Sequence, residues 1–194
     1  MKKRTLAMVL AVLMLCSVCF TGCGNSKEWN GKHNVEMVIK NYGTITLQIN
    51  ADVAPQTASN FLNLAKRGFY NGTTIYRAID GFAIYGGDPQ GNGTGTSGTE
   101  LYGEFTSNGF NNTLSNSSGA IGMARGTNKN SASCQFYILE NDATWLDGDF
   151  AVFGYVVDGM DVVRQIASGA AVTGTDGYIA KSNQPVISSV KVVT

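Results

Sequence analysis

The sequence predicts a mainly β protein, in which about eight antiparallel strands form a closed barrel capped by two helices. Three observations indicate this fold class. Apolar residues alternate with polar ones, or form short apolar runs, in most of the ordered segments. Helical spacing of apolar residues is confined to two segments, and glycine, asparagine, serine and threonine dominate the longest connection. A closed barrel is expected because it leaves no unpaired strand edge.

The first two strands are expected to form a hairpin. Val35, Met37 and Ile39 alternate with more polar positions, and the same alternation returns over residues 45–49. Asn41-Tyr42-Gly43 lies between the two segments and has the composition of a tight turn. The two-residue period and the turn together predict a β-hairpin.

A helix is expected to follow the hairpin. Pro55 opens it, at a position where the missing backbone N–H costs nothing. Lys66-Arg67-Gly68 gives it a positively charged last turn and a stop signal. Its apolar positions at helical spacing are Ala58, Phe61, Leu62 and Ala65. A second helix is predicted over 160–167, strands over 74–79, 82–85, 120–124, 135–139, 150–157 and 186–193, and surface loops over 86–118.

The N-terminal residues are typical of an export signal. Lys2, Lys3 and Arg4 precede an apolar stretch over residues 6–20. That stretch is shorter than the roughly 20 apolar residues of a membrane span and fits the core of a signal peptide. Phe20-Thr21-Gly22-Cys23 then places small residues directly before a cysteine. This run resembles the lipobox of bacterial lipoproteins, although Phe20 stands where Leu is preferred.

The lipobox resemblance implies that residues 1–22 are a lipoprotein signal peptide and that Cys23 becomes diacylated. Residues 23–33 would then be a short lipidated tether, and residues 34–194 the folded domain. We therefore expect an extracytoplasmic protein that acyl chains such as palmitate anchor to the cell membrane. An ordinary secretory signal is the alternative, but an A-x-A-like cleavage site is lacking.

Composition argues against several kinds of site. Without residues 1–22 the chain has 172 residues, with 11 basic and 14 acidic side chains and a net charge of −3. This balance does not suggest a surface for nucleic acid or for an anionic membrane. Cys23 and Cys134 are the cysteines that remain, and His33 is the single histidine. We therefore expect no metal site, no histidine-based triad and no disulfide, and a buried, unreactive Cys134.

Residues 70–89 read YNGTTIYRAIDGFAIYGGDP. This segment resembles the pattern YxGxxFHRxIxxFxxQGGD of the cyclophilins. Further blocks agree with that family in the right order, at residues 54–61, 119–125, 133–138, 145–148, 152–154 and 157–163. The resemblance covers about residues 35–194, and it implies an eight-stranded cyclophilin-like barrel with two helices.

The resemblance also implies a peptidyl-prolyl cis-trans isomerase, which needs no cofactor. Amide resonance opposes rotation about a peptide bond with a barrier of ~18–20 kcal/mol. In the twisted state the prolyl nitrogen regains a lone pair, to which a fixed cation can donate a hydrogen bond. Arg77 matches the catalytic arginine of the family, and a guanidinium group suits this task because it stays charged.

The other site residues implied by the resemblance form a hydrophobic cup for the proline ring and a polar grip on the neighbouring backbone. Phe82 matches the cup and Gln135 the grip, and both are expected to take part in catalysis. The remaining matching positions are expected to bind substrate: Ala83, Tyr85, Ala124, Arg125, Tyr137, Trp145, Leu146 and Phe150.

Five positions depart from the family pattern. Ala83 replaces the usual Met, which widens the cup, and Tyr85 replaces the usual Gln. Tyr76, Tyr137 and Phe150 stand where His, Phe and His are usual. Ala83 and Tyr85 together predict reduced or altered turnover.

The sequence thus predicts an isomerase that assists the folding of exported proteins at the membrane surface. Its expected partners are proline-containing unfolded or extended polypeptides and, through the lipid, the membrane. We expect no nucleic-acid partner and a monomer. The alternative is a peptide-binding or chaperone-like module of the same fold with little catalysis, which Ala83 and Tyr85 motivate. The variant Arg77→Ala separates these two functions, because an isomerase would lose its rate of prolyl isomerisation whereas a binding module would lose little.

Overall fold

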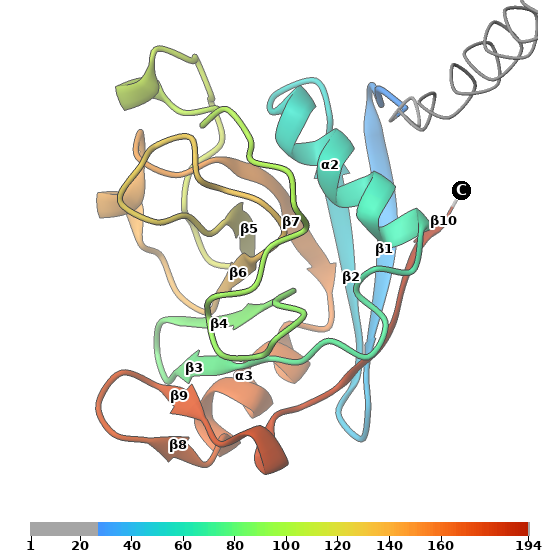
Figure 1. Cartoon of the computed structure of the whole chain (residues 1–194), viewed down its shortest axis with the longest axis vertical. Coiled ribbons are helices and arrows are strands. Elements are labelled where there is room, and N and C mark those ends of the chain that lie inside the picture. Colours follow the sequence, from blue (N-terminus) through green and yellow to red (C-terminus); the bar gives the residue numbers. More distant parts are fainter. Residues whose placement is uncertain (1–26, 194) are drawn as a thin grey trace, which may run out of the picture.

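A single antiparallel sheet and two α-helices make up residues 27–193, the part of the chain that the structure describes (Figure 1). The structure is a computed structural model, and the predicted signal peptide and Cys23 lie outside the described residues. The helices are α2 (Pro55–Lys66) and α3 (Met160–Gly169), and three 3₁₀ turns are η1 (Thr106–Asn108), η2 (Thr144–Leu146) and η3 (Lys181–Asn183). The strands are β1 (Lys32–Ile39), β2 (Gly43–Asn50), β3 (Arg77–Ile79), β4 (Ala83–Gly86), β5 (Ala120–Met123), β6 (Phe136–Leu139), β7 (Val152–Asp158), β8 (Val172–Thr173), β9 (Tyr178–Ile179) and β10 (Ile187–Val193).

The mainly β class and the two helices are confirmed, but the closed eight-stranded barrel is wrong. The sheet has ten strands in the order β10-β1-β2-β7-β5-β6-β4-β3-β9-β8, and its end strands β10 and β8 do not pair with each other. The closest approach to closure is an isolated bridge between Thr74 and Val186. The neighbouring Pro185 accepts a hydrogen bond from the Ile75 N–H but has no N–H to donate, so the ladder does not extend there.

The predicted hairpin is confirmed as β1 and β2. Val35 pairs with Leu47 and Met37 with Ile45, and all four side chains are fully buried. Asn41 in the turn has a φ of 67°, a left-handed conformation that Asn tolerates better than most residues. The two-residue period therefore places one face of the hairpin in the core.

Helix α2 begins at Pro55 as predicted, and a distant residue caps it. The Gln56 and Thr57 N–H groups donate to the two carboxylate oxygens of Glu104, at 2.9 and 2.8 Å. Glu104 is fully buried, where the positive end of the helix dipole favours its charge. This contact fixes part of the long loop over residues 86–118 against the helix.

Two hydrophobic clusters lie on opposite faces of the strands β4, β5 and β6. The larger contains Ile84, Ile121 and Ile138, and both helices pack into it. The smaller contains the alternate residues Ala83, Ala120, Tyr137 and Leu139. Because successive side chains of a strand point to opposite faces, the smaller cluster is on the face that α2 leaves open.

The residues before β1 pack against α2, although residues 23–33 were expected to be a tether. The Trp29 N–H donates to Ser59 Oγ, and its indole N–H donates to Asn63 Oδ1, both at 3.0 Å. The packed part of the chain therefore includes residues before 34. In the part of the chain that the structure describes, no helix has the length and apolar character to cross a membrane.

Candidate active site

Four neighbouring strands place a row of residues across one face of the sheet. Arg77 on β3 lies opposite Tyr85 on β4. Tyr85 lies opposite Tyr137 on β6, and Tyr137 lies opposite Gly122 on β5. Directly opposite residues of antiparallel strands have Cβ atoms about 4.5–5.5 Å apart and point to the same face. A cation, two phenol rings and a stretch of bare backbone therefore follow one another across the sheet.

The guanidinium group of Arg77 lies between two aromatic rings. Its Cζ atom is 4.8 Å from the ring centroid of Tyr85 and 5.6 Å from that of Tyr178. Its Nε donates a hydrogen bond to the Asp176 carbonyl oxygen at 2.6 Å. Its terminal nitrogens make no hydrogen bond to another of residues 27–193, so they are available to a ligand. Tyr85 is half-buried, and burial raises its pKa although the charge of Arg77 acts in the opposite direction.

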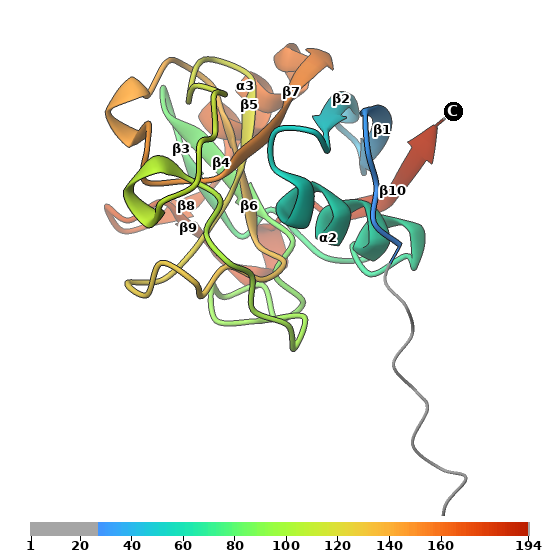
Figure 2. The same ribbon diagram turned by 90° about the horizontal axis from the view of Figure 1, so that it is seen from above.

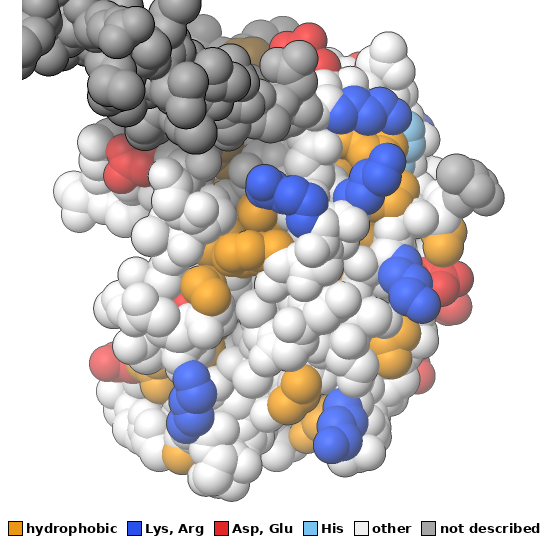
Figure 3. Space-filling view, turned by 45° about the vertical axis from the view of Figure 1, so that its right-hand side comes forward, with side chains coloured by type: hydrophobic (Ala, Val, Ile, Leu, Met, Phe, Trp, Pro, Cys, Tyr) orange, Lys and Arg blue, Asp and Glu red, His pale blue; other side chains and the backbone are white. Residues whose placement is uncertain are grey.

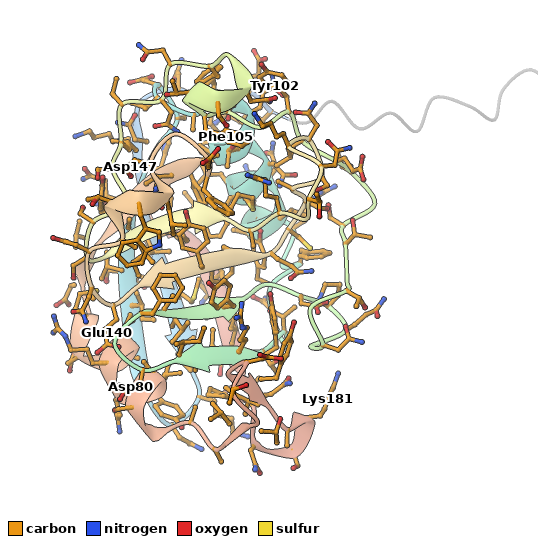
Figure 4. The ribbon with its side chains drawn as sticks, turned by 90° about the vertical axis from the view of Figure 1, so that its left-hand side faces the viewer. Asp80, Tyr102, Phe105, Glu140, Asp147 and Lys181 are labelled. Atoms are coloured by element: carbon orange, nitrogen blue, oxygen red, sulfur yellow. The ribbon has the colours of Figure 1, made fainter. Side chains whose placement is uncertain are left out.

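The predicted cup residues gather in the smaller hydrophobic cluster, on the face shown in Figure 4. Trp145 is 70% exposed and stacks on Phe82, with ring centroids 6.0 Å apart and ring planes 18° apart. Phe150 meets the Tyr137 ring edge-on at 6.0 Å. The partly buried residues packed around the buried ones include Phe82, Tyr85, Ala124, Leu146 and Phe150. The structure thus provides an open apolar surface with aromatic walls.

A chain of hydrogen bonds connects Tyr137 to the turn η2. The Tyr137 hydroxyl donates to Asn116 Oδ1 at 2.5 Å, and the Asn116 side chain donates to Asp147 Oδ1 at 2.9 Å. Burial raises the pKa of Tyr137, so its hydroxyl stays a donor. Burial also acts to raise the pKa of Asp147, but donors from Asn116 and Ser115 lower it overall. Asp147, labelled in Figure 4, directly follows Trp145 and Leu146, so the chain fixes that side of the cup.

Gly122 is required for the position of the Tyr137 ring. A Cβ atom at Gly122 would lie 2.1 Å from the Tyr137 hydroxyl oxygen and 2.2 Å from the adjacent ring carbon. The ring therefore covers the bare backbone of β5. Any side chain at this position would displace it from the row.

A polar groove of about 450 Å³ opens beside the apolar cluster. Tyr85 and Ala124 belong to both the groove and the cluster, so the two compartments are continuous. Beside Ala124, the Arg125 guanidinium lies 4.7 Å from the ring centroid of Phe150, which belongs to the apolar cluster. The predicted site residues that line the groove are Arg77, Tyr85, Ala124, Arg125 and Gln135. This arrangement suits an extended peptide, with one apolar ring in the cluster and the neighbouring backbone along the groove.

Gln135 lies in the groove, but the protein itself engages its amide. Gln135 Oε1 accepts from the Tyr76 hydroxyl at 2.6 Å. Its Nε2 donates to the carbonyl oxygens of Gly93 and Gly95, at 3.2 and 2.8 Å. Burial raises the pKa of Tyr76, which keeps the hydroxyl a donor. Gln135 therefore holds one wall of the groove and keeps one acceptor lone pair free.

The same wall is shaped by the buried carboxylate of Asp88. It accepts the N–H groups of Gln90, Asn92 and Gly93 at 2.8, 2.9 and 2.6 Å. Burial acts to raise the Asp88 pKa, but these donors and the Gly95 N–H lower it overall. A Cβ atom at Gly95 would lie 1.8 Å from the carboxylate, so only glycine fits there.

The residues that shape the site but were not predicted from the sequence include Asn116, Asp176 and Tyr178. Asp176 and Tyr178 belong to the β8–β9 hairpin, whose strands have two residues each. Gly174 and Asp176-Gly177 are turn signals that could have indicated the hairpin. Two-residue strands, however, are too short to show a period.

The fold and this site define a β protein with a fixed cation at the edge of an apolar surface. The family model described as "Cyclophilin type peptidyl-prolyl cis-trans isomerase/CLD" matches residues 34–192. The chain belongs to this family of peptidyl-prolyl cis-trans isomerases, as the sequence motifs predicted.

Individual relatives agree with the family assignment. The Peptidyl-prolyl cis-trans isomerase-like 1 of Rhizopus delemar is 40% identical over 124 residues, which cover 64% of this chain and 74% of that protein. A Staphylococcus saprophyticus protein assigned to the peptidyl-prolyl cis-trans isomerases is 31% identical over 169 residues, covering 73% of this chain and 84% of that protein. A cyclophilin type peptidyl-prolyl cis-trans isomerase of Cryptosporidium parvum, solved in the presence of the dipeptide Ala-Pro, superposes with a TM-score of 0.72 at 25% identity. That structural match covers 83% of this chain and 99% of the other.

Proposed function

We propose that this protein accelerates the cis–trans isomerisation of X–Pro bonds in exported polypeptides, at the outer surface of the membrane to which Cys23 anchors it. The observation that carries the catalytic part is the fixed guanidinium group of Arg77. Its Cζ atom lies close to the rings of Tyr85 and Tyr178, its Nε donates to a carbonyl oxygen, and its terminal nitrogens make no hydrogen bond within residues 27–193.

The chemistry requires stabilisation of a twisted amide and no covalent step. An acceleration of about five decades needs roughly 7 kcal/mol of preferential binding to the twisted state. When the bond twists, the prolyl nitrogen becomes a hydrogen-bond acceptor, and a terminal nitrogen of Arg77 donates to it. Such a bond to a charged donor contributes about 1.5–3 kcal/mol. The remainder comes from holding the proline ring and the flanking backbone in place.

The apolar cluster is the proposed seat of the proline ring. Phe82, Tyr137, Leu146 and Phe150 provide its walls, and Trp145 lies at the open edge. Ala83 leaves this seat wider than a larger side chain would. We therefore expect kcat/KM below that of a cup with the usual Met.

The proposed location and clients rest on the sequence. Lys2 to Cys23 has the features of a lipoprotein signal. Exported chains arrive unfolded, and isomerisation of their X–Pro bonds takes tens of seconds or longer without a catalyst. Recovery of lipidated protein in the membrane fraction, and loss of that lipid in Cys23→Ala, tests the anchor.

The activity is tested with the fragment from Gly24 onward. The Cryptosporidium parvum chain consists almost wholly of this domain, so we expect the fragment to fold by itself. The assay follows isomerisation of a short prolyl peptide by wild type, Arg77→Ala and Arg77→Lys. Arg77→Ala should lower kcat/KM about 10- to 100-fold, from the loss of one charged hydrogen bond. Arg77→Lys should recover little, because an ammonium group lacks the planar donors.

The matched control is Arg164→Ala, which removes an exposed arginine from α3. It should keep the wild-type rate. A rate in Arg77→Ala equal to that of this control would refute the catalytic role of Arg77.

A binding module with little catalysis is the second candidate. The observation that favours it is the engagement of Gln135 by Tyr76, Gly93 and Gly95, which leaves the groove with a weaker polar grip. If the folded fragment binds prolyl peptides but does not accelerate their isomerisation, this candidate replaces the first.

A further inference from the structure

We propose that the surface around Trp29 docks on anionic membrane lipids and holds the domain with its peptide groove turned away from the bilayer. This proposal rests on the proposed lipid anchor. We call this surface the Trp29 face and define it by Lys27, Trp29, Lys32, His33, Lys66 and Lys191.

The Trp29 face surrounds a shallow groove of about 730 Å³ between α2, β1 and β10. Its four lysines come from the segment before β1, the first residue of β1, the last turn of α2, and β10. Figure 3 shows lysine and arginine side chains gathered with apolar side chains and the histidine on this part of the surface.

The indole of Trp29 is fixed at the centre of this face. Two hydrogen bonds to α2, at Ser59 and Asn63, hold its backbone and its ring nitrogen. The Lys27 ammonium lies 3.8 Å from the ring centroid, and that of Lys66 lies 5.9 Å away. A tryptophan with a polar edge and an apolar body is the side chain preferred at a membrane–water interface. Lysines around it supply the contact to lipid phosphates.

The charge of this face is opposite in sign to the net charge of −3 of residues 23–194. No carboxylate lines the groove in the described part of the chain. Two exposed carboxylates lie close by, since Glu28 stands between Lys27 and Trp29 in the sequence and Glu36 lies opposite Lys191 in the β1–β10 ladder, but neither lines the groove. Four lysines around the groove against these two carboxylates leave a local net charge of +2 (4 − 2), within a chain whose net charge after residue 22 is −3.

The length of the chain before Lys27 places the Trp29 face close to the membrane. Lys27 is four residues after Cys23, and four residues span at most about 14 Å when fully extended. Attraction between a lysine and an anionic surface extends over a Debye length of about 8–10 Å. A lipid on Cys23 would therefore keep this face within or near the range of the headgroup charge.

The peptide groove lies on the other side of the molecule. Figures 1 and 2 both show α2, β1 and β10 on one side, with β3, β4, β6 and the β8–β9 hairpin on the other. When the Trp29 face rests on the bilayer, Arg77 and the cup consequently face away from it. Docking would thus leave the groove open to polypeptides in the surrounding space.

The test uses the fragment from Gly24 onward, which carries no lipid, and vesicles of phosphatidylcholine with or without phosphatidylglycerol. Co-sedimentation should show binding only to the vesicles with phosphatidylglycerol, and binding should weaken as salt is added. The variant Lys27→Gln/Lys32→Gln should bind about 25-fold more weakly, because each lysine near an anionic surface contributes about fivefold. The matched control is Lys40→Gln/Lys181→Gln, which removes the same charge from exposed positions outside the groove. This control should lose far less of its affinity for the vesicles with phosphatidylglycerol.

The two tryptophans of the chain report the orientation. Trp29 lies on the proposed docking face and Trp145 at the peptide cup. A quencher attached to the lipid headgroups should quench Trp29 in the variant Trp145→Phe, and leave Trp145 unquenched in Trp29→Phe. Equal binding to both kinds of vesicle, equal losses in the two double variants, or quenching of Trp145 alone would overturn the proposal.

These measurements are independent of the proposed enzyme and anchor. The isomerase assay contains no vesicles, so a failure there leaves the docking result unchanged. Absence of lipid on Cys23 would refute the anchor, and vesicle binding by the unlipidated fragment would still decide the docking surface.

Discussion

Tyr178 is expected to act as a positioning residue for Arg77. It lies on the β8–β9 hairpin, its ring centroid is 5.6 Å from the Arg77 Cζ, and it is 40% exposed. A cation–π contact at an exposed site contributes about 0.5–1 kcal/mol. Removing one of the two rings therefore gives a loss of about two- to fivefold in kcat/KM for Tyr178→Ala. The Asp176 carbonyl remains as an acceptor, which limits the loss to this range.

The assay compares Tyr178→Ala with Tyr178→Phe on a short prolyl peptide. The phenylalanine ring preserves the contact, and the Tyr178 hydroxyl makes no hydrogen bond within residues 27–193, so Tyr178→Phe should restore most of the rate. A purely structural role is tested by repeating Tyr178→Ala in the Arg77→Ala background. There it should cost nothing further, because the group that it positions has gone.

Two results would refute this reasoning. A loss in Tyr178→Phe as large as that in Tyr178→Ala would show that the ring is not the supporting group. A twofold or larger loss that persists without Arg77 would show that Tyr178 acts on the peptide or on the fold.

Two further predictions concern stability. The variant Tyr137→Phe restores the residue usual in the family, but it should lower the free energy of unfolding by about 1–3 kcal/mol. The cause is that Oδ1 of the fully buried Asn116 loses its hydrogen-bond donor. Urea unfolding measures this loss, and unchanged stability would contradict the prediction. The protein should also lose stability as the pH rises above about 9, because burial raises the pKa of the Cys134 thiol from 9.0 to about 11 and also raises that of Tyr70. Both groups are neutral in the folded state, so stability is full at lower pH and falls once the unfolded chain releases these protons. Urea unfolding between neutral and alkaline pH checks this, and Cys134→Ala should flatten part of the decline.

Local patterns in the sequence predicted the local parts of the fold. The β1–β2 hairpin follows from a two-residue period and a turn, and α2 follows from Pro55 and helical spacing. Closure of the sheet could not be derived in this way, because it depends on whether distant segments pair. The carboxylate that caps α2, Glu104, is 47 residues from Thr57 and belongs to a loop that shows no period of its own.

The same distinction between local sequence patterns and contacts of distant residues applies to the candidate site. The motif order identified Arg77 and the cup residues, and the structure brings them together on one face. The groups that hold them, such as Asn116 and the Asp176 carbonyl, act through contacts across long stretches of sequence. Net charge cannot indicate the Trp29 face for a related reason, since it sums over the whole chain whereas this face depends on where the folded chain places a few lysines.

Ala83 and Tyr85, the two departures from the family pattern on which the prediction of reduced turnover was based, have different structural consequences. Ala83 and Tyr85 lie two residues apart on β4 and therefore point to the same face. The Tyr85 ring stacks on Arg77, so this substitution removes an amide but supports the cation. Ala83 makes no comparable contact with the cation, and its small side chain is fully buried among its neighbours, where the usual Met would present more bulk to the cup. A wider cup weakens the grip on proline in the ground and twisted states alike, and such a loss raises KM more than it lowers kcat. We therefore infer that this site is weak in holding the substrate. Arg77, the proposed catalytic residue, gains support from the Tyr85 ring that the usual Gln at this position would not provide.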